Sequence, residues 1–147
     1  MKFEIQFISA QETIDLRSRI LRPGQKFELC HYPEDNLISS FHLGIKLGDR
    51  IVCNGTFLQQ GHKHFLDARH PYRLRGMATD FDFQKKGLGA QLIARALEEL
   101  KQKNCDLLWF NARTSAEGFY KKLGFTAVEE IFDIPTIGPH KVMFSNI

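Results

Sequence analysis

Two lysines and two glycines stand directly before a helical pattern in the segment Gln84–Leu92, which reads QKKGLGAQL. A helix start leaves about four backbone N–H groups without an intrahelical acceptor, and the helix dipole adds roughly half a positive charge there. Gly87 and Gly89 carry no side chain, so an anion can approach these amides. The side chains before them can add hydrogen bonds or charge: Gln84, Lys85 and Lys86. The segment is compatible with a phosphate-binding loop, although two glycines alone favour a turn that simply begins a helix.

Two common phosphate loops do not match this segment. The P-loop pattern G-x-x-x-x-G-K-[ST] does not occur in the chain. The dinucleotide fingerprint G-x-G-x-x-G has Leu92 in place of its third glycine, and no acidic ribose partner follows about 20 residues on. A nucleoside triphosphate or dinucleotide is therefore not indicated.

The composition is that of a folded protein. The chain has 147 residues, which suits one domain over residues 1–147, and 43% of them are apolar, which argues against disorder. A net charge of +3 is too small to indicate nucleic-acid binding. The three cysteines lack paired spacing, which indicates reduced thiols and no metal site. With no signal-peptide pattern and no long apolar run, we expect a cytoplasmic protein that does not contact membranes.

Hydrophobic periodicity predicts strands and helices that alternate along the chain. The expected elements are a strand at about 2–9, a helix capped by Ser9 and Glu12 and stopped by Pro23, strands at about 41–47 and 50–59, a loop at 60–70, a strand at about 72–80 interrupted by Gly76, a helix at about 88–103, a strand at about 105–112, a short helix from Thr114 or Ser115 to Gly124, and strands at about 125–132 and 140–146. Gly76 indicates a bulge or a close approach to the backbone. The order predicts a mixed α/β sheet with helices on its faces.

Two stretches then resemble the GCN5-related N-acetyltransferases. MATDFDFQKKGLGAQLI is similar to the family signature Q/R-x-x-G-x-G/A, which follows a strand and opens a helix; Gln84, Gly87 and Gly89 fill its defining places. LLWFNARTSAEGFYKKLGF is similar to the family's next strand, its polar end and the helix that carries a Tyr before LGF. The strong match covers about residues 72–126. It implies a single domain with about six to seven strands, helices on both faces, and a splayed strand pair that holds the cofactor.

The resemblance implies acetyl-coenzyme A as the acetyl donor. Its pyrophosphate would lie on the amides at the helix start, beside Gln84, and its pantetheine arm would pair like an extra strand with the end of the preceding strand. Such an arm needs backbone partners that no neighbouring strand has taken. A gap is thus expected between the strands that end near Thr79 and Asn111. The implied cofactor-binding residues are Met77, Ala78, Thr79, Gln84, Lys85, Lys86, Gly87, Leu88, Gly89, Ala90, Asn111 and Tyr120.

The implied reaction is direct acyl transfer to an amine, with no covalent enzyme intermediate. A backbone N–H of Met77 or Ala78 would stabilise the oxyanion, and Tyr120 would protonate the leaving thiolate as general acid. Each residue has a plainer alternative: Tyr120 as a core aromatic, Asn111 as a turn residue, the lysines as a solvated pair. A different class also stays open, a non-catalytic module that binds acyl-coenzyme A as a sensor or partner subunit.

The sequence indicates the residues that would bind the acetyl acceptor less clearly. A small-molecule or peptide amine needs carboxylates and a base, and histidine can shuttle protons near neutral pH. The weak candidates are Glu34, Asp35, Asp133 and His140, with Asp80, His31 and His42 as further choices. Arg17, Arg19 and Arg22 could instead meet an acidic acceptor or form the solvent face of the first helix. The family also contains many dimers, so a homodimer is one expectation.

Overall fold

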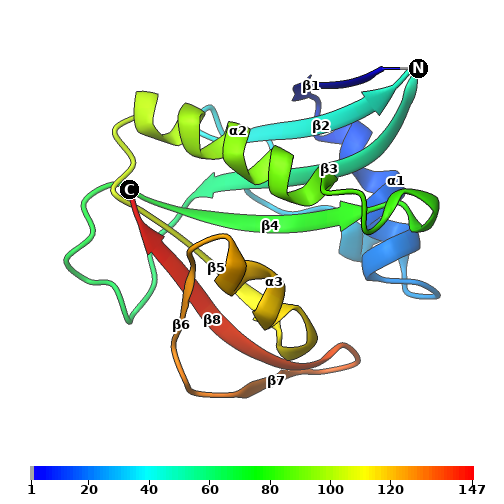
Figure 1. Cartoon of the computed structure of the whole chain (residues 1–147). Coiled ribbons are helices and arrows are strands. Elements are labelled where there is room, and N and C mark those ends of the chain that lie inside the picture. Colours follow the sequence, from blue (N-terminus) through cyan, green and yellow to red (C-terminus); the bar gives the residue numbers. More distant parts are fainter. Residues whose placement is uncertain (1) are drawn as a thin grey trace. The chain divides into compact units, whose positions relative to one another are not determined.

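The computed structural model describes residues 2–147 (Figure 1). The chain forms two compact units, Met1–Leu58 with Leu74–Glu99 and Gln59–Arg73 with Leu100–Ile147. Three elements contribute residues to both units: β3 (Arg50–Gln59), β4 (Pro71–Thr79) and α2 (Leu88–Gln102). A single domain over residues 1–147 stays a prediction.

The first unit holds the N-terminal strands and two helical layers. Its remaining elements are β1 (Phe3–Ile8), a 3-10 turn (Gln11–Thr13), α1 (Ile14–Leu16), a π-helical turn (Arg17–Leu21), a 3-10 turn (Phe27–Cys30), β2 (Phe41–Leu47) and a 3-10 turn (Phe81–Phe83). The strand order in this unit is β1-β2-β3-β4, and both β1–β2 and β2–β3 are antiparallel. The strands predicted at 41–47 and 50–59 are confirmed.

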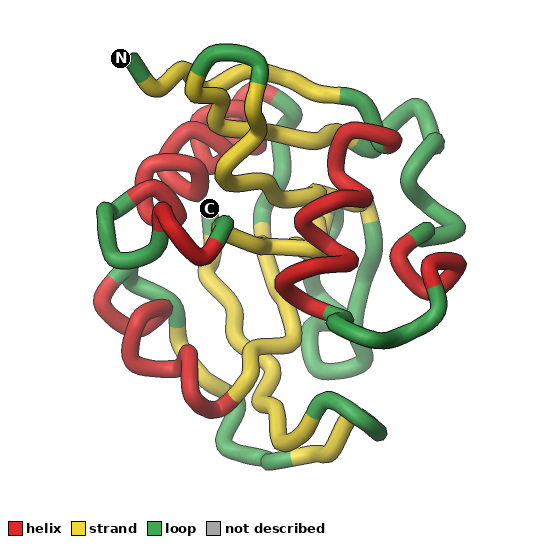
Figure 2. The backbone as a smooth tube through the Cα atoms, turned by 90° about the vertical axis from the view of Figure 1, so that its right-hand side faces the viewer, coloured by secondary structure: helices red, strands yellow, loops and turns green. Residues whose placement is uncertain are grey.

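Strand β3 is buried on both faces because each face meets a helical layer. The side chains of Asn54 and Thr56 point toward the first helix, where Asn54 donates to the Thr13 carbonyl and Thr56 accepts from Arg17. The intervening Gly55 points the other way: a Cβ there would lie 3.3 Å from Leu92 of α2. Figure 2 shows α1 and α2 on opposite sides of these strands. Glycine thus lets α2 pack closely on β3.

The first helix begins as its sequence predicts. The Ser9 N–H donates to the Glu12 carboxylate (2.9 Å) and the Glu12 N–H donates to the Ser9 hydroxyl (3.2 Å), which is a capping box. The helix ends before Pro23. Arg17, however, does not form its solvent face: it is fully buried and hydrogen-bonds to Asp35 and Thr56. That expectation is wrong for Arg17, because a helical period does not show which charged residue has a buried partner.

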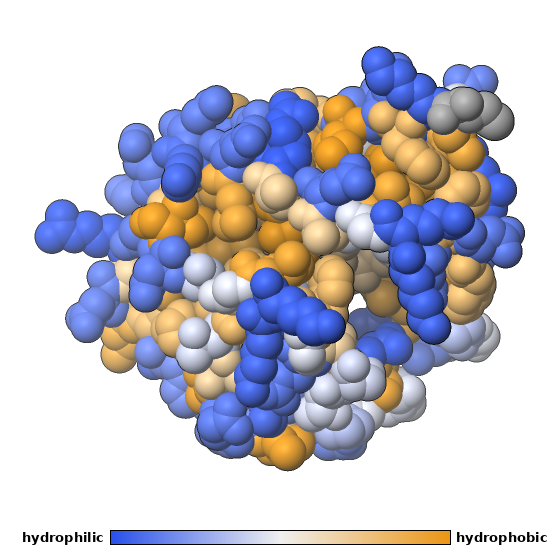
Figure 3. Space-filling view, in the orientation of Figure 1, coloured by the Kyte–Doolittle hydropathy of each residue, from blue (hydrophilic) through white to orange (hydrophobic). Residues whose placement is uncertain are grey.

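Strand β1 leaves some apolar surface exposed. Phe3 is 38% and Phe7 51% exposed, and Figure 3 shows apolar atoms at the surface close to β1. Phe3 meets Phe83 edge to face at 6.2 Å, and the Arg95 guanidinium of α2 lies 5.6 Å from the Phe7 ring. These contacts tie the edge strand to the turn before α2 and to α2 itself.

The second unit mixes parallel and antiparallel strands. Its own elements are β5 (Leu107–Arg113), a 3-10 turn (Thr114–Ala116), α3 (Glu117–Lys122), β6 (Thr126–Ala127), β7 (Phe132–Ile134) and β8 (Gly138–Asn146). The start of β4 pairs in parallel with β5, which pairs antiparallel with β8, and β8 pairs with both β6 and β7. The predicted mixed α/β fold is confirmed.

Residues 2–147 contain eight strands, because the strand predicted at 125–132 is divided into β6 and β7. Ala127 of β6 pairs with Met143, whereas Phe132 of β7 pairs with His140. The chain thus advances five residues (132 − 127) against three in β8 (143 − 140). The two surplus residues leave the ladder, as in a β-bulge, and carry exposed Glu129 and Glu130 with them.

Candidate active site

The predicted phosphate loop lies between β4 and α2 in the first unit. The Gln84 side chain donates to the Thr79 carbonyl (3.1 Å), which holds the loop against the end of β4. Lys85 and Gly87 have φ angles of +62° and +78°, so the backbone reverses sharply before the helix. The first α-helical hydrogen bond joins the Gln91 N–H to the Gly87 carbonyl (3.1 Å). The amides just before Gln91 therefore have no acceptor within the helix.

The loop is open to an anion. Gln84, Lys85, Lys86 and Gly87 are all exposed, and no atom lies within 4 Å of the position that a Gly87 Cβ would take. Amides, dipole and lysines thus present positive potential on one exposed turn. The structure places this loop directly after Met77–Thr79, as predicted, and all these residues belong to the first unit.

The end of β4 packs against β3. Ala78 is buried, and the Met77 sulfur lies 3.3 Å from where a Gly55 Cβ would be. The Thr79 hydroxyl donates to the Cys53 sulfur (3.3 Å). Burial raises the pKa of the Cys53 thiol to about 11, so it is protonated at neutral pH and unsuited to act as a nucleophile.

Asp80 anchors the turn that follows β4. Its buried carboxylate accepts hydrogen bonds from Arg19 (2.9 Å) and Arg50 (2.8 Å), and its N–H donates to the Val52 carbonyl (2.8 Å). Burial opposes the charge of this carboxylate, but the hydrogen bonds from Arg19 and Arg50 outweigh it, so the pKa of Asp80 lies below its usual value. Both partners of the carboxylate are side chains of the protein itself, so Asp80 supports the loop.

The depressed pKa makes the contribution of Asp80 to stability depend on pH. A group whose pKa is lower in the folded state stabilises fully above its unfolded pKa of about 3.9, and this stabilisation is lost as pH falls through the folded pKa. We therefore expect the loss of unfolding free energy in Asp80→Asn to be large at about pH 6 and to shrink toward pH 3 in urea titrations. Asp82→Asn, which alters an exposed neighbouring carboxylate, should change the unfolding free energy little. A constant Asp80→Asn penalty across this range would contradict the linkage.

The proposed acceptor residues of the first unit have protein partners. Asp35 is buried and forms a bidentate ion pair with Arg17 (2.7 and 2.9 Å). Glu34 lies 3.9 Å from Arg75, and His42 contacts the Thr56 hydroxyl (2.7 Å) and the Asp35 carbonyl (3.0 Å). Burial lowers the pKa of His42. These acids bind the protein's own arginines, and their role toward an acceptor stays a prediction.

Tyr120 lies on α3 in the second unit, within an aromatic cluster. Its ring centroid is 4.4 Å from that of Phe110, 5.0 Å from Phe119 and 6.2 Å from Phe125, and the residue is only 9% exposed. Gly124 ends the helix with a φ of +97°, as predicted for a left-handed C-terminal position. The cluster fixes the ring, so the direction of its hydroxyl is set by packing.

Asn111 occupies the opposite face of β5, because alternate residues of a strand point to opposite sides and Phe110 points toward Tyr120. Its side-chain Oδ1 is buried and has no hydrogen-bond partner within the described chain. It lines a cavity of about 290 Å³ with His62, Lys63, His64 and Glu130, among others. The sequence predicted only a loop at residues 60–70; the His-x-His spacing was the one signal that could have drawn attention to it.

The two candidates of the second unit lie on neighbouring strands, Asp133 on β7 and His140 on β8. His140 is buried beside Phe132, with ring centroids 5.9 Å apart, and its Nδ1 lies 2.7 Å from the Gly138 carbonyl. Asp133 is exposed on β7. In residues 2–147, no group of three or more His, Cys, Asp or Glu side chains could hold a metal ion.

The chain is similar to known acetyltransferases. Residues 41–127 match the family model described as an acetyltransferase (GNAT) domain. The uncharacterized N-acetyltransferase YitI of Bacillus subtilis is 39% identical over 144 residues, which cover 98% of this chain and 96% of that protein. A putative N-acetyltransferase from Lactobacillus plantarum shares the fold at a TM-score of 0.80 and 16% identity, with 99% of both chains covered. An aminoglycoside 6'-N-acetyltransferase complexed with coenzyme A does so at 0.73 and 12%, with 97% of this chain and 96% of that chain covered.

At these identities the two solved structures bear on the fold alone.

None of the helices in residues 2–147 combines the length and hydropathy that crossing a membrane requires.

Proposed function

The chain belongs to the GNAT acetyltransferase family, and we propose that it transfers the acetyl group of acetyl-coenzyme A directly to a primary amine of a small molecule or a peptide. The observation that carries the proposal is the exposed turn at Gln84–Gly87 with the start of α2 that follows it. It presents free helix-start amides, two lysines and a Gly87 without a side chain to a bound anion. The pyrophosphate of acetyl-coenzyme A is an anion that suits this turn.

The chemistry needs three groups in addition to the phosphate loop. The amine nitrogen forms a bond to the acetyl carbon, the carbon–sulfur bond breaks, the nitrogen loses a proton and the sulfur gains one. We propose a backbone N–H of Met77 or Ala78 as oxyanion donor and the Tyr120 hydroxyl as proton donor to sulfur. A phenol pKa near 10 and a thiol pKa near 8.5 are close enough for this transfer.

The pantetheine arm requires free backbone groups. The pairing of β4 with β5 joins Pro71–Arg73 to Leu107–Trp109, and both strands continue beyond it, to Thr79 and Arg113. This short ladder supports a place for the arm along Met77–Thr79. The proposed contact of the arm with Asn111 stays a prediction.

Gly89→Glu should abolish or strongly weaken acetyl-coenzyme A binding. Glutamate in the first turn of a helix is favourable for the helix dipole by about 0.3–1 kcal/mol, so the variant should remain folded. Its carboxylate would repel the pyrophosphate from the loop amides. We expect calorimetric titration to show a Kd at least about tenfold weaker, which corresponds to about 1.4 kcal/mol.

Gln91→Glu is the matched control, because it adds the same charge at an exposed position in the same helical turn. It should change the Kd by much less than Gly89→Glu. Equal weakening in both variants would mean that overall charge, and not the loop, sets the affinity. A wild-type protein that does not bind acetyl-coenzyme A would rule out the proposed function.

A further inference from the structure

Two cavities adjoin on one face of the second unit. The smaller, of about 290 Å³, includes Asn111, Val142 and Glu130 in its lining, and the larger, of about 640 Å³, includes Leu107 and Phe144. His64 and Val128 line both cavities and so stand where the two meet. All these residues belong to the second unit.

The two cavities share a floor made by β5 and β8. Leu107 and Asn111 point to the same face of β5, since alternate residues of a strand share a side. Opposite them in β8 stand Asn146 and Val142, their register partners. Four residue steps of about 3.3 Å separate Leu107 from Asn111, so these residues stand about 13 Å apart, with the buried Trp109 between them on the same face.

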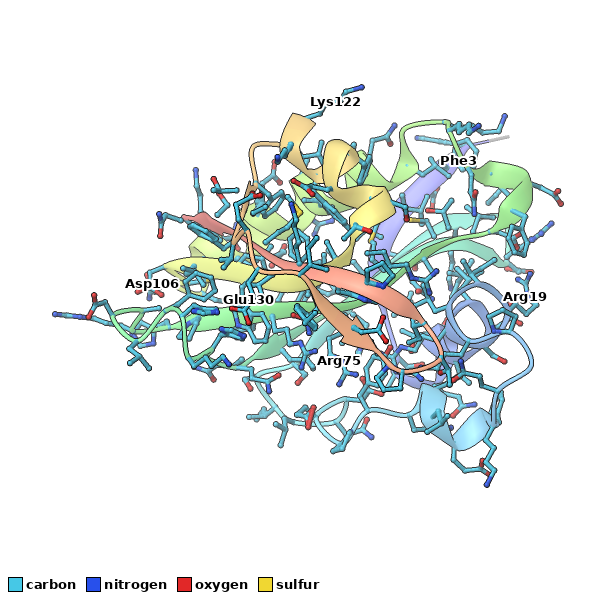
Figure 4. The ribbon with its side chains drawn as sticks, turned by 90° about the horizontal axis from the view of Figure 1, so that it is seen from below. Phe3, Arg19, Arg75, Asp106, Lys122 and Glu130 are labelled. Carbon is cyan, nitrogen blue, oxygen red and sulfur yellow. The ribbon has the colours of Figure 1, made fainter. Side chains whose placement is uncertain are left out.

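The smaller cavity is the polar end. The buried Asn111 Oδ1 lacks a donor within residues 2–147, and a buried amide oxygen favours a ligand N–H. The Glu130 carboxylate lies 3.9 Å from His64 Nε2 and remains largely exposed, so it can attract an ammonium group (Figure 4). The Nδ1 of His62 accepts the His64 N–H (3.1 Å), which leaves the neutral imidazole with its proton on Nε2.

The larger cavity is the apolar end. Its apolar lining residues are Phe65, Leu66, Ala68, Leu107, Val128 and Phe144. Two acids also line it: the Asp106 carboxylate already accepts the N–H groups of Arg69 (2.7 Å) and His70 (3.0 Å), and Asp67 is exposed. The apolar walls therefore offer surface for a hydrocarbon chain.

We infer that this double cavity binds a primary amine with an extended apolar chain, its ammonium group at Asn111 and Glu130 and its chain in the larger cavity. The inference rests on the proposed function in one respect, that this amine is the acetyl acceptor. Lys63 also lines the polar end, where its charge opposes that of the bound ammonium group, so Glu130 has to supply the attraction. The acceptor class is thus an alkyl- or arylalkylamine.

Titration with n-alkylamines, without acetyl donor, tests the site itself. From butylamine to octylamine the Kd should tighten about three- to fourfold for each methylene that becomes buried. Ala68→Leu, which fills the larger cavity, should weaken octylamine at least about tenfold and leave butylamine almost unchanged. Leu66→Ser changes a side chain that is 85% exposed, which should spare folding, and should weaken octylamine in the same direction.

The charged end has its own matched pair. Glu130→Gln should weaken all the amines several-fold. Glu129→Gln, at the neighbouring exposed acid that pairs with Lys141 (3.1 Å) instead of lining the cavity, should have no effect.

A Kd that does not depend on chain length, or that Ala68→Leu leaves unchanged for octylamine, would overturn the inferred site. Octylamine that binds as expected but is not acetylated, while acetyl-coenzyme A binds, would overturn its assignment as acceptor. Failure of acetyl-coenzyme A to bind would remove the proposed function and the acceptor role with it, and the amine titration would still decide the site.

Discussion

Tyr120→Phe is expected to lower kcat about 10²- to 10⁴-fold, the usual contribution of a positioned general acid. The change removes one oxygen atom. The ring contacts with Phe110 and Phe125 survive, since they do not use the hydroxyl. The Kd for acetyl-coenzyme A should therefore change little, and the loss should fall on the chemical step.

Two measurements separate this role from a structural one. Tyr72→Phe removes a hydroxyl from another buried tyrosine, outside the proposed site, and should retain most of the activity. If the acetyl donor is a thioester of a more acidic thiol, its thiolate leaves without help from an acid. The loss of kcat in Tyr120→Phe should therefore be smaller with such a donor. A deficit that is the same for both donors would assign the hydroxyl to positioning. An unchanged kcat of Tyr120→Phe with acetyl-coenzyme A would contradict the proposed role of Tyr120 as general acid.

Local signals explain why much of the fold, including the turn before α2, could be predicted. The capping box joins Ser9 to Glu12, and Gly87 reverses the chain just before the helix. Each of these features depends on residues within three or four positions, so the local sequence is enough to predict it. The hairpin strands at 41–47 and 50–59 are likewise joined by a short turn, with Gly48 at a φ of +63°. In each case the interacting groups are neighbours along the chain.

The remaining features depend on partners that are distant in sequence. Arg17 meets Asp35 eighteen residues on and Thr56 thirty-nine residues on, which no helical period reveals. Gly76 was expected to mark a bulge or a close approach. It has a φ of +64°, and a Cβ there would also lie 2.9 Å from the Nε of the distant Arg17. The cavity beside Asn111 needs the loop at residues 62–64 and a strand about fifty residues later, which only tertiary packing brings together.

Asp35→Ala is expected to cost about 3–5 kcal/mol of unfolding free energy, because it leaves the Arg17 charge buried without its counter-ion. Arg17 is fully buried and donates to both oxygens of Asp35, to the Thr56 hydroxyl and to the Cys30 carbonyl (2.9 Å). Its guanidinium also stacks on the Tyr32 ring at 3.9 Å. Urea unfolding followed by circular dichroism would give the loss, with an unchanged m-value as the check on the unfolded state.

The exposed pair of the same helix is the matched control. Asp15 and Arg19 also form a close ion pair (2.8 Å), but their side chains are 68% and 43% exposed. Solvent screens such a pair, so Asp15→Ala should cost less than about 1 kcal/mol. A similar cost for Asp15→Ala and Asp35→Ala would mean that burial does not amplify the Arg17 interaction.

A double variant tests whether the ion pair or its volume stabilises the first unit. In Arg17→Met with Asp35→Leu no charge is left unpaired, so much of the stability lost in Asp35→Ala should return. The Thr56 hydroxyl would lose the donor Arg17 but keep its 2.7 Å contact with His42 Nδ1. Since Arg17 also packs against Gly76, one residue before Met77, recovery of stability without recovery of kcat would show that the buried arginine also positions the end of β4 for catalysis.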